Sequence, residues 1–354
     1  MAEPVTIEAI FEALGRVTYP GYAADIATLG LVEQVAALPD ASGFALTLRQ
    51  VTARDDVMQR VAAMVNHALA HDLGVAKIEL RVRRVEPELG EKTGRVRLDG
   101  TKYIVAVASG KGGVGKSTVA ANLACALAQL GLSVGLLDAD IYGPSIPMMF
   151  ATADERPKSA GGQNFYPIEK YGVKLISIGF FLGEKAPVIW RGPMVMGAVR
   201  QFLRDTLWGT QDFLIVDLPP GTGDAQLTLA QQVAIDGVII VTTPQDVAVL
   251  DAMRAVKMFR QVHCPLLGIV ENMSYFVCPD CGERDELFGR GGGEAMAAEE
   301  GIGVLRQIPI YPELRAAGDS GMPLVIKSPE HPASLAFKEL ARRVVAAMPP
   351  VTIN

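Results

Sequence analysis

The sequence predicts an α/β protein with a doubly wound, mostly parallel sheet, preceded by a small α+β domain. From residue 102 onward, short apolar runs alternate with helical stretches, which is the pattern of βα units. The runs are apolar throughout instead of alternating, as expected for strands covered on both faces. The first run leads into a glycine-rich loop and a helix, the arrangement of a phosphate-binding fold.

The composition fits two domains with sizeable cores. The chain has 354 residues, of which 49% are hydrophobic and 20% charged. Its net charge of −6 disfavours general binding to nucleic acid or to a membrane surface, because either partner would repel it. The N-terminus lacks a signal-peptide pattern, and no apolar run reaches the roughly 18 residues that a spanning helix needs. We therefore expect a cytoplasmic protein with neither nucleic acid nor membrane as a partner.

Residues 1–88 are predicted to form the small α+β domain. Helical periodicity or strand-like alternation marks four segments there: 7–14, 43–51, 55–74 and 76–85. Residues 89–101 are polar and rich in charge and glycine, which is typical of a linker. Residues 102–354 then form the second domain. Its expected strands lie in 103–109, 133–140, 173–179, 213–221, 236–244 and 265–273.

The segment GKGGVGKS, residues 110–117, matches the phosphate-loop pattern G-x-x-x-x-G-K-[ST] in full. Glycines let backbone N–H groups turn toward phosphate oxygens, and the start of the following helix adds its positive dipole end. Lys116 is expected to neutralise the phosphates of ATP, and Ser117 to hold Mg²⁺. The expected nucleotide-binding residues of the loop are Gly110, Lys111, Gly112, Gly113, Val114, Gly115, Lys116, Ser117 and Thr118.

Three aspartates at predicted strand ends are candidates for binding the metal and orienting water. Asp217 ends an apolar strand, where a Walker B acid reaches the metal directly or through water. Asp138 and Asp140 end another strand, and one would orient the attacking water while the other supports the metal. An acid in such a place can also cap a helix. Beside a phosphate loop we favour catalysis.

The C-x-x-C pair, Cys278 and Cys281, supplies two thiolates, which is half of a usual four-thiolate site. A two-fold dimer would bring four thiolates to one axis. Such ligands suit a [4Fe–4S] cluster or zinc, and a redox-active pair or a pair without a ligand are further possibilities. The remaining two cysteines, Cys125 and Cys264, are expected to be core thiols.

Around these motifs the sequence resembles a known family. The stretch KGGVGKS, with its additional Lys111, is similar to the deviant Walker A loop of the MinD/ParA/nitrogenase-iron-protein class. Five further segments resemble the Mrp/ApbC branch of that class: LLDADIYGPSIPMMF, VIWRGPMVMGAVRQFL, DFLIVDLPPGTGDAQLTLAQ, VTTPQDVAVLDAMRAVKMF and GIVENMSYFVCPDCG. The resemblance extends over residues 101–350.

The resemblance implies a P-loop ATPase that hydrolyses ATP slowly and carries a [4Fe–4S] cluster. Its implied partners are a second copy of the chain, assembly scaffolds and apo iron–sulfur proteins that receive the cluster. Lys111 would reach the nucleotide of the other subunit, as a catalytic residue together with Lys116 and the three aspartates. Cys278 and Cys281 would hold the cluster at the dimer interface. Asn272 would contact the adenine, and the segment 308–312 would help to close that pocket.

The N-terminal domain resembles small metal–sulfur biosynthesis domains, but the stretch LRQVTARDDV lacks the cysteine that such domains often carry. The missing cysteine therefore favours a recognition or docking role for this domain over a role in cluster or thiol chemistry.

Two other functions compete with the carrier. A MinD/ParA-like positioning ATPase with a structural zinc would need a membrane-binding tail or a basic DNA-binding surface. The C-terminal segment 337–354 has little charge and few bulky apolar residues for such an anchor. An electron-transfer reductase like the nitrogenase iron protein has widely separated cysteines, unlike the adjacent pair here.

Overall fold

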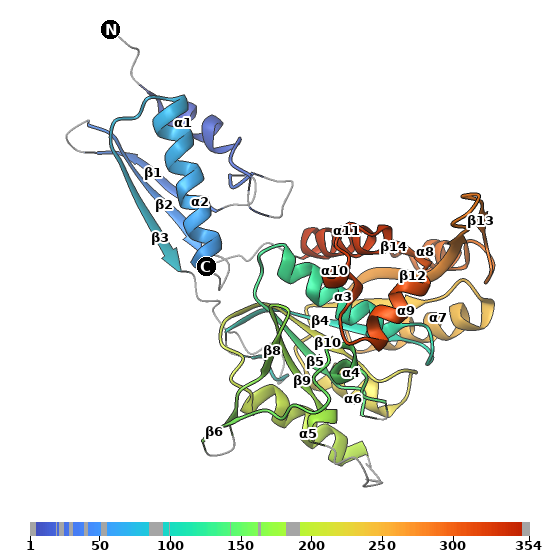
Figure 1. Ribbon diagram of the computed structural model, residues 1–354. Helices are drawn as coiled ribbons and strands as arrows, with labels where there is room; N and C mark the ends of the chain where they lie inside the picture. The colour runs from blue at the N-terminus through green and yellow to red at the C-terminus, as the bar shows by residue number, and fades with distance from the viewer. Residues whose placement is uncertain are drawn as a thin grey trace. The chain divides into compact units, whose positions relative to one another are not determined.

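The computed structural model describes residues 5–18, 20, 25–27, 31–38, 42–50, 55–84, 95–98, 100–141, 143–161, 164–181 and 192–348. The chain divides near residue 87 into two compact units, each with its own sheet (Figure 1). Among the described residues, no helix combines the length and the apolar character needed to cross a bilayer.

The first unit is a three-stranded sheet packed with helices. Its elements are α1 Ile7–Leu14, β1 Val32–Ala37, β2 Phe44–Gln50, α2 Asp55–His67, a π-helical turn η1 Ala68–Asp72, and β3 Ile78–Arg84. β2 is the central strand and pairs antiparallel with β1 and parallel with β3. α1 is amphipathic and buries Ile10, Ala13 and Leu14, while the hydroxyl of Thr6 caps its first turn.

The second unit contains the larger sheet. Its elements are β4 Thr101–Ser109, α3 Lys116–Gln129, β5 Val134–Asp138, α4 Ile146–Met149, β6 Ser159–Gly161, β7 Asn164–Phe165, β8 Ile168–Lys170, β9 Val173–Ser177, η2 Ile178–Phe180, α5 Gly192–Asp205, β10 Gln211–Asp217, α6 Asp224–Gln232, β11 Gly237–Thr242, α7 Asp246–Gln261, β12 Leu266–Val277, β13 Arg284–Asp285, α8 Gly292–Glu300, β14 Val304–Ile310, α9 Pro312–Asp319, α10 Leu324–Lys327 and α11 Pro332–Ala347.

The sheet runs in the order β13-β12-β11-β4-β10-β5-β9-β8, and β14 also pairs with β12. The pairs from β12 to β9 and the β12–β14 pair are parallel, whereas β8 and β13 pair antiparallel at the two ends. Helices lie on both sides of this sheet (Figure 1). The predicted α/β fold with a mostly parallel sheet is confirmed.

The central strands are continuously apolar because both of their faces are covered. Every residue of β5, β10 and β11 is buried. Each fully buried large side chain, such as Ile104 or Leu214, contributes roughly 1.5–3 kcal/mol through removal of its apolar surface from water. These strands therefore form a rigid support for the loops at their carboxyl ends.

Residues 95–98, the described end of the predicted linker, pack against the second unit. Val96 forms a bridge with Val233, and the Arg97 guanidinium lies 3.0 Å from a carboxylate oxygen of Asp236. Leu98 is buried in the core of this unit. The alternation of arginine with valine and leucine is strand-like, but the two charges make the segment look like a solvated linker.

Parallel pairing brings the functional loops to one edge of the sheet. Asp217, the last residue of β10, is in register with Val107 on β4 and with Asp138 on β5. The segments that follow these three strands therefore begin side by side, at the edge where α/β folds bind their ligands.

Candidate nucleotide and metal–sulfur sites

The loop between β4 and α3 has the conformation of an anion-binding turn. Gly113 and Gly115 both have φ of +82°, in the left-handed region that glycine adopts without strain. No described residue accepts a hydrogen bond from the backbone N–H groups of residues 112–115. These groups, at the start of a helix, are available to the oxygens of a phosphate.

Close packing on both sides fixes the loop. A Cβ atom on Gly110 would lie 2.1 Å from the backbone carbon of Asp251 in α7. A Cβ atom on Gly115 would lie 2.3 Å from the side-chain nitrogen of Asn272 in β12, and this nitrogen donates a hydrogen bond to the carbonyl of Val114 at 2.9 Å. The absence of side chains at these two positions is what allows α7 and β12 to touch the loop.

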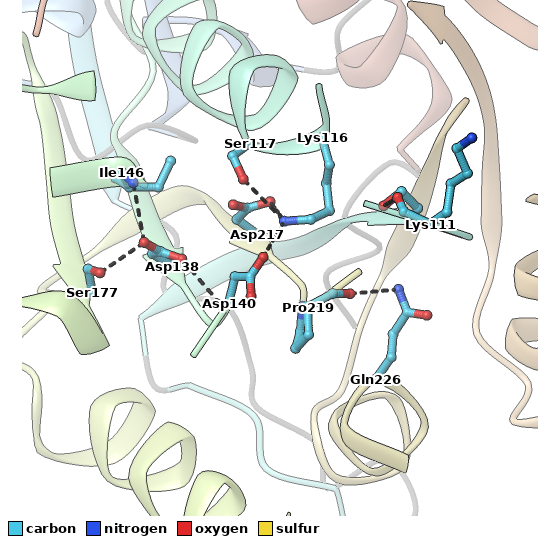
Figure 2. Close-up of polar contacts among 11 residues, drawn as sticks. Lys111, Lys116, Ser117, Asp138, Asp140, Ile146, Ser177, Asp217, Pro219 and Gln226 are labelled. Atoms are coloured by element: carbon cyan, nitrogen blue, oxygen red, sulfur yellow. Dashed lines mark hydrogen bonds and ion pairs between the residues drawn. The ribbon is translucent and has the colours of Figure 1, made fainter. Parts of the chain in front are cut away.

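Lys116 is buried within a group of polar side chains (Figure 2). Its Nζ lies 2.6 Å from Asp217 Oδ1, 3.6 Å from Asp140 Oδ2 and 3.2 Å from Ser117 Oγ. Burial raises the pKa of Asp217 above its ordinary value, and the adjacent lysine opposes that rise. The positive charge of Lys116 therefore lies against the carboxyl groups of Asp217 and Asp140.

The same residues fit Mg²⁺. Asp140 Oδ1 and Asp217 Oδ2 are buried and have no hydrogen-bond partner among the described residues. Mg²⁺ prefers oxygen ligands and is commonly held by one or two carboxylates, waters and substrate phosphates. In the described part of the chain, no three His, Cys, Asp or Glu side chains converge as a metal site. A cation here would thus depend on the phosphates of a nucleotide as well as on Asp140, Asp217 and Ser117.

Asp138 lies beside this group but contacts other partners (Figure 2). Its Oδ2 accepts hydrogen bonds from Ser177 Oγ at 2.9 Å and from the Ile146 N–H at 3.3 Å, and its Oδ1 accepts from the Asp140 N–H at 3.2 Å. Burial, with the neighbouring Asp217 charge, raises the pKa of Asp138 to about 8. The structure therefore brings Asp140 and Asp217 to the buried lysine, whereas Asp138 holds the turn between β5 and α4.

Lys111 points away from the buried lysine (Figure 2). Its side chain is half-buried, and its ammonium group has no hydrogen bond or ion pair with any residue that the structure describes. The hydroxyl of Ser109 fixes the backbone at this point by donating to the Lys111 carbonyl at 2.9 Å. A charged group in a rigid loop is thus left without a partner within the described chain.

The cysteine pair lies in a hairpin at the edge of the sheet, between β12 and β13 (Figure 1). Val277 pairs with Arg284, and the N–H of Gly282 donates to the Cys278 carbonyl at 2.9 Å. Gly282 has φ of +73°, which completes the tight turn. Cys278 is half-buried and Cys281 is exposed.

Backbone N–H groups favour the ionised form of the first cysteine. Those of Cys281 and Asp280, together with the Cys281 side chain, lower the pKa of Cys278. A thiolate stabilised in this way is the form that binds metals. The other two cysteines, Cys125 and Cys264, are buried as expected, so two accessible thiols remain per chain.

Two polar residues at this edge were not predicted. Gln226, in α6, is 1% exposed; its amide nitrogen donates to the Pro219 carbonyl at 3.3 Å and its oxygen has no partner among the described residues. Ser177 holds Asp138. Ser177 ends a parallel strand, the signal that identified the aspartates, and Gln226 is a polar residue on the buried face of a helix next to the loop after Asp217.

Comparison with known proteins identifies the family. The model of the NUBPL iron-transfer P-loop NTPases, of the ParA group, matches residues 100–345. The chain belongs to this family. The iron–sulfur cluster carrier protein of Aquifex aeolicus is 53% identical over 249 residues, 70% of this chain and 68% of that protein. The carrier protein of Synechocystis sp. is 43% identical over 344 residues, 96% of this chain and 97% of that protein.

A solved member of the same fold supports the nucleotide site. The nucleotide-binding protein of Archaeoglobus fulgidus, in complex with ADP, has 40% sequence identity and a TM-score of 0.59 over 67% of this chain and 92% of that chain. Membership of the NUBPL family confirms the resemblance inferred from the additional lysine and the C-x-x-C segment. The chain is a P-loop NTPase of an iron–sulfur carrier and transfer family. The roles of individual residues stay predictions.

Proposed function

We propose that the protein binds and slowly hydrolyses ATP, holds a [4Fe–4S] cluster between two copies of the chain, and passes the cluster to apo-proteins. The observation that carries this proposal is the C-x-x-C hairpin, which lies in the same unit as a complete phosphate loop. Within the hairpin, backbone N–H groups stabilise the thiolate form of Cys278. Relatives that are 53% and 43% identical to this chain over the matched residues bear the name iron–sulfur cluster carrier protein. We infer that the N-terminal unit, residues 1–88, docks partner proteins.

The nucleotide would bind at the loop of residues 110–118. The open N–H groups would hold its phosphates, Lys116 would move from its carboxylates to the β- and γ-phosphates, and Mg²⁺ would take the freed oxygens of Asp140 and Asp217 together with Ser117. Asn272, which contacts the loop, would line the adenine side. Bound Mg²⁺ would supply charge stabilisation for phosphoryl transfer.

The cluster would be shared. Two thiols per chain make half of a four-thiolate site, and a two-fold dimer places four at one axis. Because Cys281 is exposed and the hairpin lies at the sheet edge, a cluster held there stays accessible to an acceptor protein. Lys111, which has no partner among the described residues, would reach the nucleotide of the second subunit and so favour the dimer when ATP is bound.

Anaerobic reconstitution tests the cluster site. We expect a brown protein with about four iron and four sulfide ions per dimer, as a shared [4Fe–4S] cluster requires. Cys278→Ser and Cys281→Ser should each lose the iron, whereas Cys264→Ala, at a buried thiol outside the hairpin, should keep it. A colourless protein that instead retains zinc would contradict the proposal.

Cluster transfer tests the carrier activity. The holo-protein is mixed with an apo-enzyme that requires a [4Fe–4S] cluster, and recovery of that enzyme's activity is followed with and without Mg²⁺–ATP. We expect transfer by the wild type and an ATP dependence that Lys116→Ala abolishes. Equal rates for both proteins under all conditions would show that nucleotide and cluster are not coupled.

A further inference from the structure

β12 contains an unusual residue between the two sites. Met273 has φ of +54°, in the left-handed region that long side chains seldom occupy. The other described non-glycine residues with positive φ lie in turns: Ala151, Tyr171 and His263. Met273 instead lies inside a strand, which is where such a conformation calls for a functional reason.

The pairing of β12 is irregular at the same place. Asn272 pairs with Ile308 on β14, and the next pair joins Phe276 to Ile310. Between these pairs β12 advances from 272 to 276 while β14 advances only from 308 to 310. The extra residues form a bulge, and a bulge re-aims the side chains that follow it.

The N-terminal side of the bulge contacts the phosphate loop. Asn272 donates to the Val114 carbonyl, and a Cβ atom on Gly115 would lie 3.7 Å from the terminal methyl carbon of Met273. The following residue, Ser274, is 1% exposed, and its hydroxyl has no hydrogen-bond partner among the described residues. The bulge is therefore fixed by the loop, while its own polar group is left unsatisfied.

The C-terminal side of the bulge leads directly to the cysteines. Phe276 and Val277 pair with β13, and Cys278 follows them. Since successive side chains of a strand point to opposite faces, a change of one residue in the register of 274–277 would turn Cys278 to the other face. The position of the first cysteine thus depends on the backbone conformation at Met273.

We propose that Met273 is a positioning residue that couples the phosphate loop to the cysteine hairpin. The hydrogen bond from Asn272 to the Val114 carbonyl holds the start of the bulge against the loop, and we assign the left-handed conformation of Met273 to the protein without nucleotide. When phosphates occupy the loop, this contact changes, Met273 relaxes toward an extended strand conformation, and the hairpin is re-aimed. This inference builds on the proposed function, because it explains how ATP would act on the cysteines.

The test follows the reactivity of the two accessible thiols in the full-length protein without a cluster. The rate of reaction with a chromogenic aromatic disulfide is measured with and without Mg²⁺–ATP, and Cys278→Ser and Cys281→Ser assign the signal to each thiol. We expect ATP to change the wild-type rate by roughly fivefold or more. Because no cluster is present, this result is independent of whether the protein carries iron.

Two substitutions should act in opposite ways. Valine disfavours the left-handed region, so Met273→Val without nucleotide should show the rate of the ATP-bound wild type. Glycine adopts that region freely, so Met273→Gly with ATP should keep the nucleotide-free rate. His263→Val places the same backbone strain at an exposed turn and should retain the full wild-type response.

Several results would overturn the coupling. An ATP response of wild-type size in Met273→Val, or a wild type whose thiols do not respond to ATP, would each contradict it. If Met273→Val does not fold, Met273→Gly decides alone, and an unchanged ATP response in that variant rejects the role of Met273. Loss of iron binding with an intact thiol response would instead reject only the proposed function.

Discussion

Lys116 is the residue on which the balance of buried charge depends. Its ammonium group compensates Asp217, which is fully buried, and Asp140, which is nearly so. Removing one partner of a buried ion pair leaves the other charge without compensation in a poorly solvated place. This residue therefore influences stability before any ligand is bound.

We predict that Lys116→Ala lowers the free energy of unfolding of the second unit by about 3 kcal/mol at pH 7. The loss should be smaller at pH 5, because Asp217, whose pKa is raised by burial, can then take up a proton. Both tryptophans, Trp190 and Trp208, belong to this unit, so urea titration followed by tryptophan fluorescence measures it. The double variant Lys116→Met with Asp217→Asn should recover most of the stability. If it is as unstable as the single variant, lost packing and not lost charge balance is the cause.

The raised pKa of Asp138 determines how this residue makes the free energy of unfolding depend on pH. Its pKa rises from 3.8 in the unfolded chain to about 8 in the fold, so between these values the folded state binds more protons than the unfolded state. The stability from this group is fully present below pH 3.8 and is lost as pH rises toward 8. We predict a decline approaching about 1.4 kcal/mol per pH unit from this residue.

Urea titrations at pH 6 and pH 8 measure that decline. Asp138→Asn cannot ionise and should flatten the dependence, although it also loses an acceptor for the Ile146 or Asp140 N–H. Asp154→Asn, at an exposed acid, should leave the dependence unchanged. A wild type that gains stability between pH 6 and pH 8 would contradict the assignment.

At the scale of elements, the packing of α7 on the phosphate loop distinguishes Gly110 from Gly112, two glycines of the same loop. A Cβ on Gly110 would overlap the α7 backbone at Asp251, whereas a Cβ on Gly112 would meet nothing within 4 Å. We predict that Gly110→Ala lowers the free energy of unfolding by about 1–3 kcal/mol and weakens ADP binding, because the added methyl group pushes the loop away from α7. Gly112→Ala should stay within about 0.5 kcal/mol of the wild type. Thermal unfolding and calorimetric titration with ADP compare them, and equal losses would show that the contact with α7 is unimportant.

The elements that the sequence predicts well are those with a uniform environment. The central strands are buried on both faces, so their apolar runs identify them, and parallel pairing then places their terminal aspartates at one edge. β1 was not predicted, because its exposed and half-buried positions do not alternate. The contact of Asn272 with Val114 joins residues 158 positions apart, so it is a result of packing that no local pattern contains.

The sequence predicts which residues form the candidate site better than it predicts how they are arranged. Lys116, Asp140 and Asp217 do lie together, as the motifs suggested. That Asp138 contacts Ser177 follows from the register of β5 with β9, which places these two residues opposite each other and which a motif does not determine. The left-handed conformation of Met273 has no sequence signal, since methionine seldom occupies that region.

At the scale of the whole molecule, the proposed role of Lys111 leads us to predict that ATP hydrolysis requires two chains. Lys111→Ala should leave the fold and ADP binding intact, because the ammonium has no partner among the described residues, and should lower ATP hydrolysis. Mixing Lys111→Ala with Lys116→Ala should restore part of the hydrolysis. In a mixed dimer of the proposed kind, the intact phosphate loop of one chain would receive Lys111 from the other. Steady-state phosphate release measures this restoration, and a mixture no more active than its components would place Lys111 in its own subunit's site.

The path of β12 also limits which segments of this protein can be exchanged with those of a relative. β12 touches the phosphate loop at Asn272, passes through the bulge and ends one residue before Cys278. A chimera joined anywhere between these two positions would combine a loop contact from one parent with a cysteine hairpin from another. Residues 266–285 therefore form a single module for recombination, whether in the laboratory or during evolution, and have to be exchanged together.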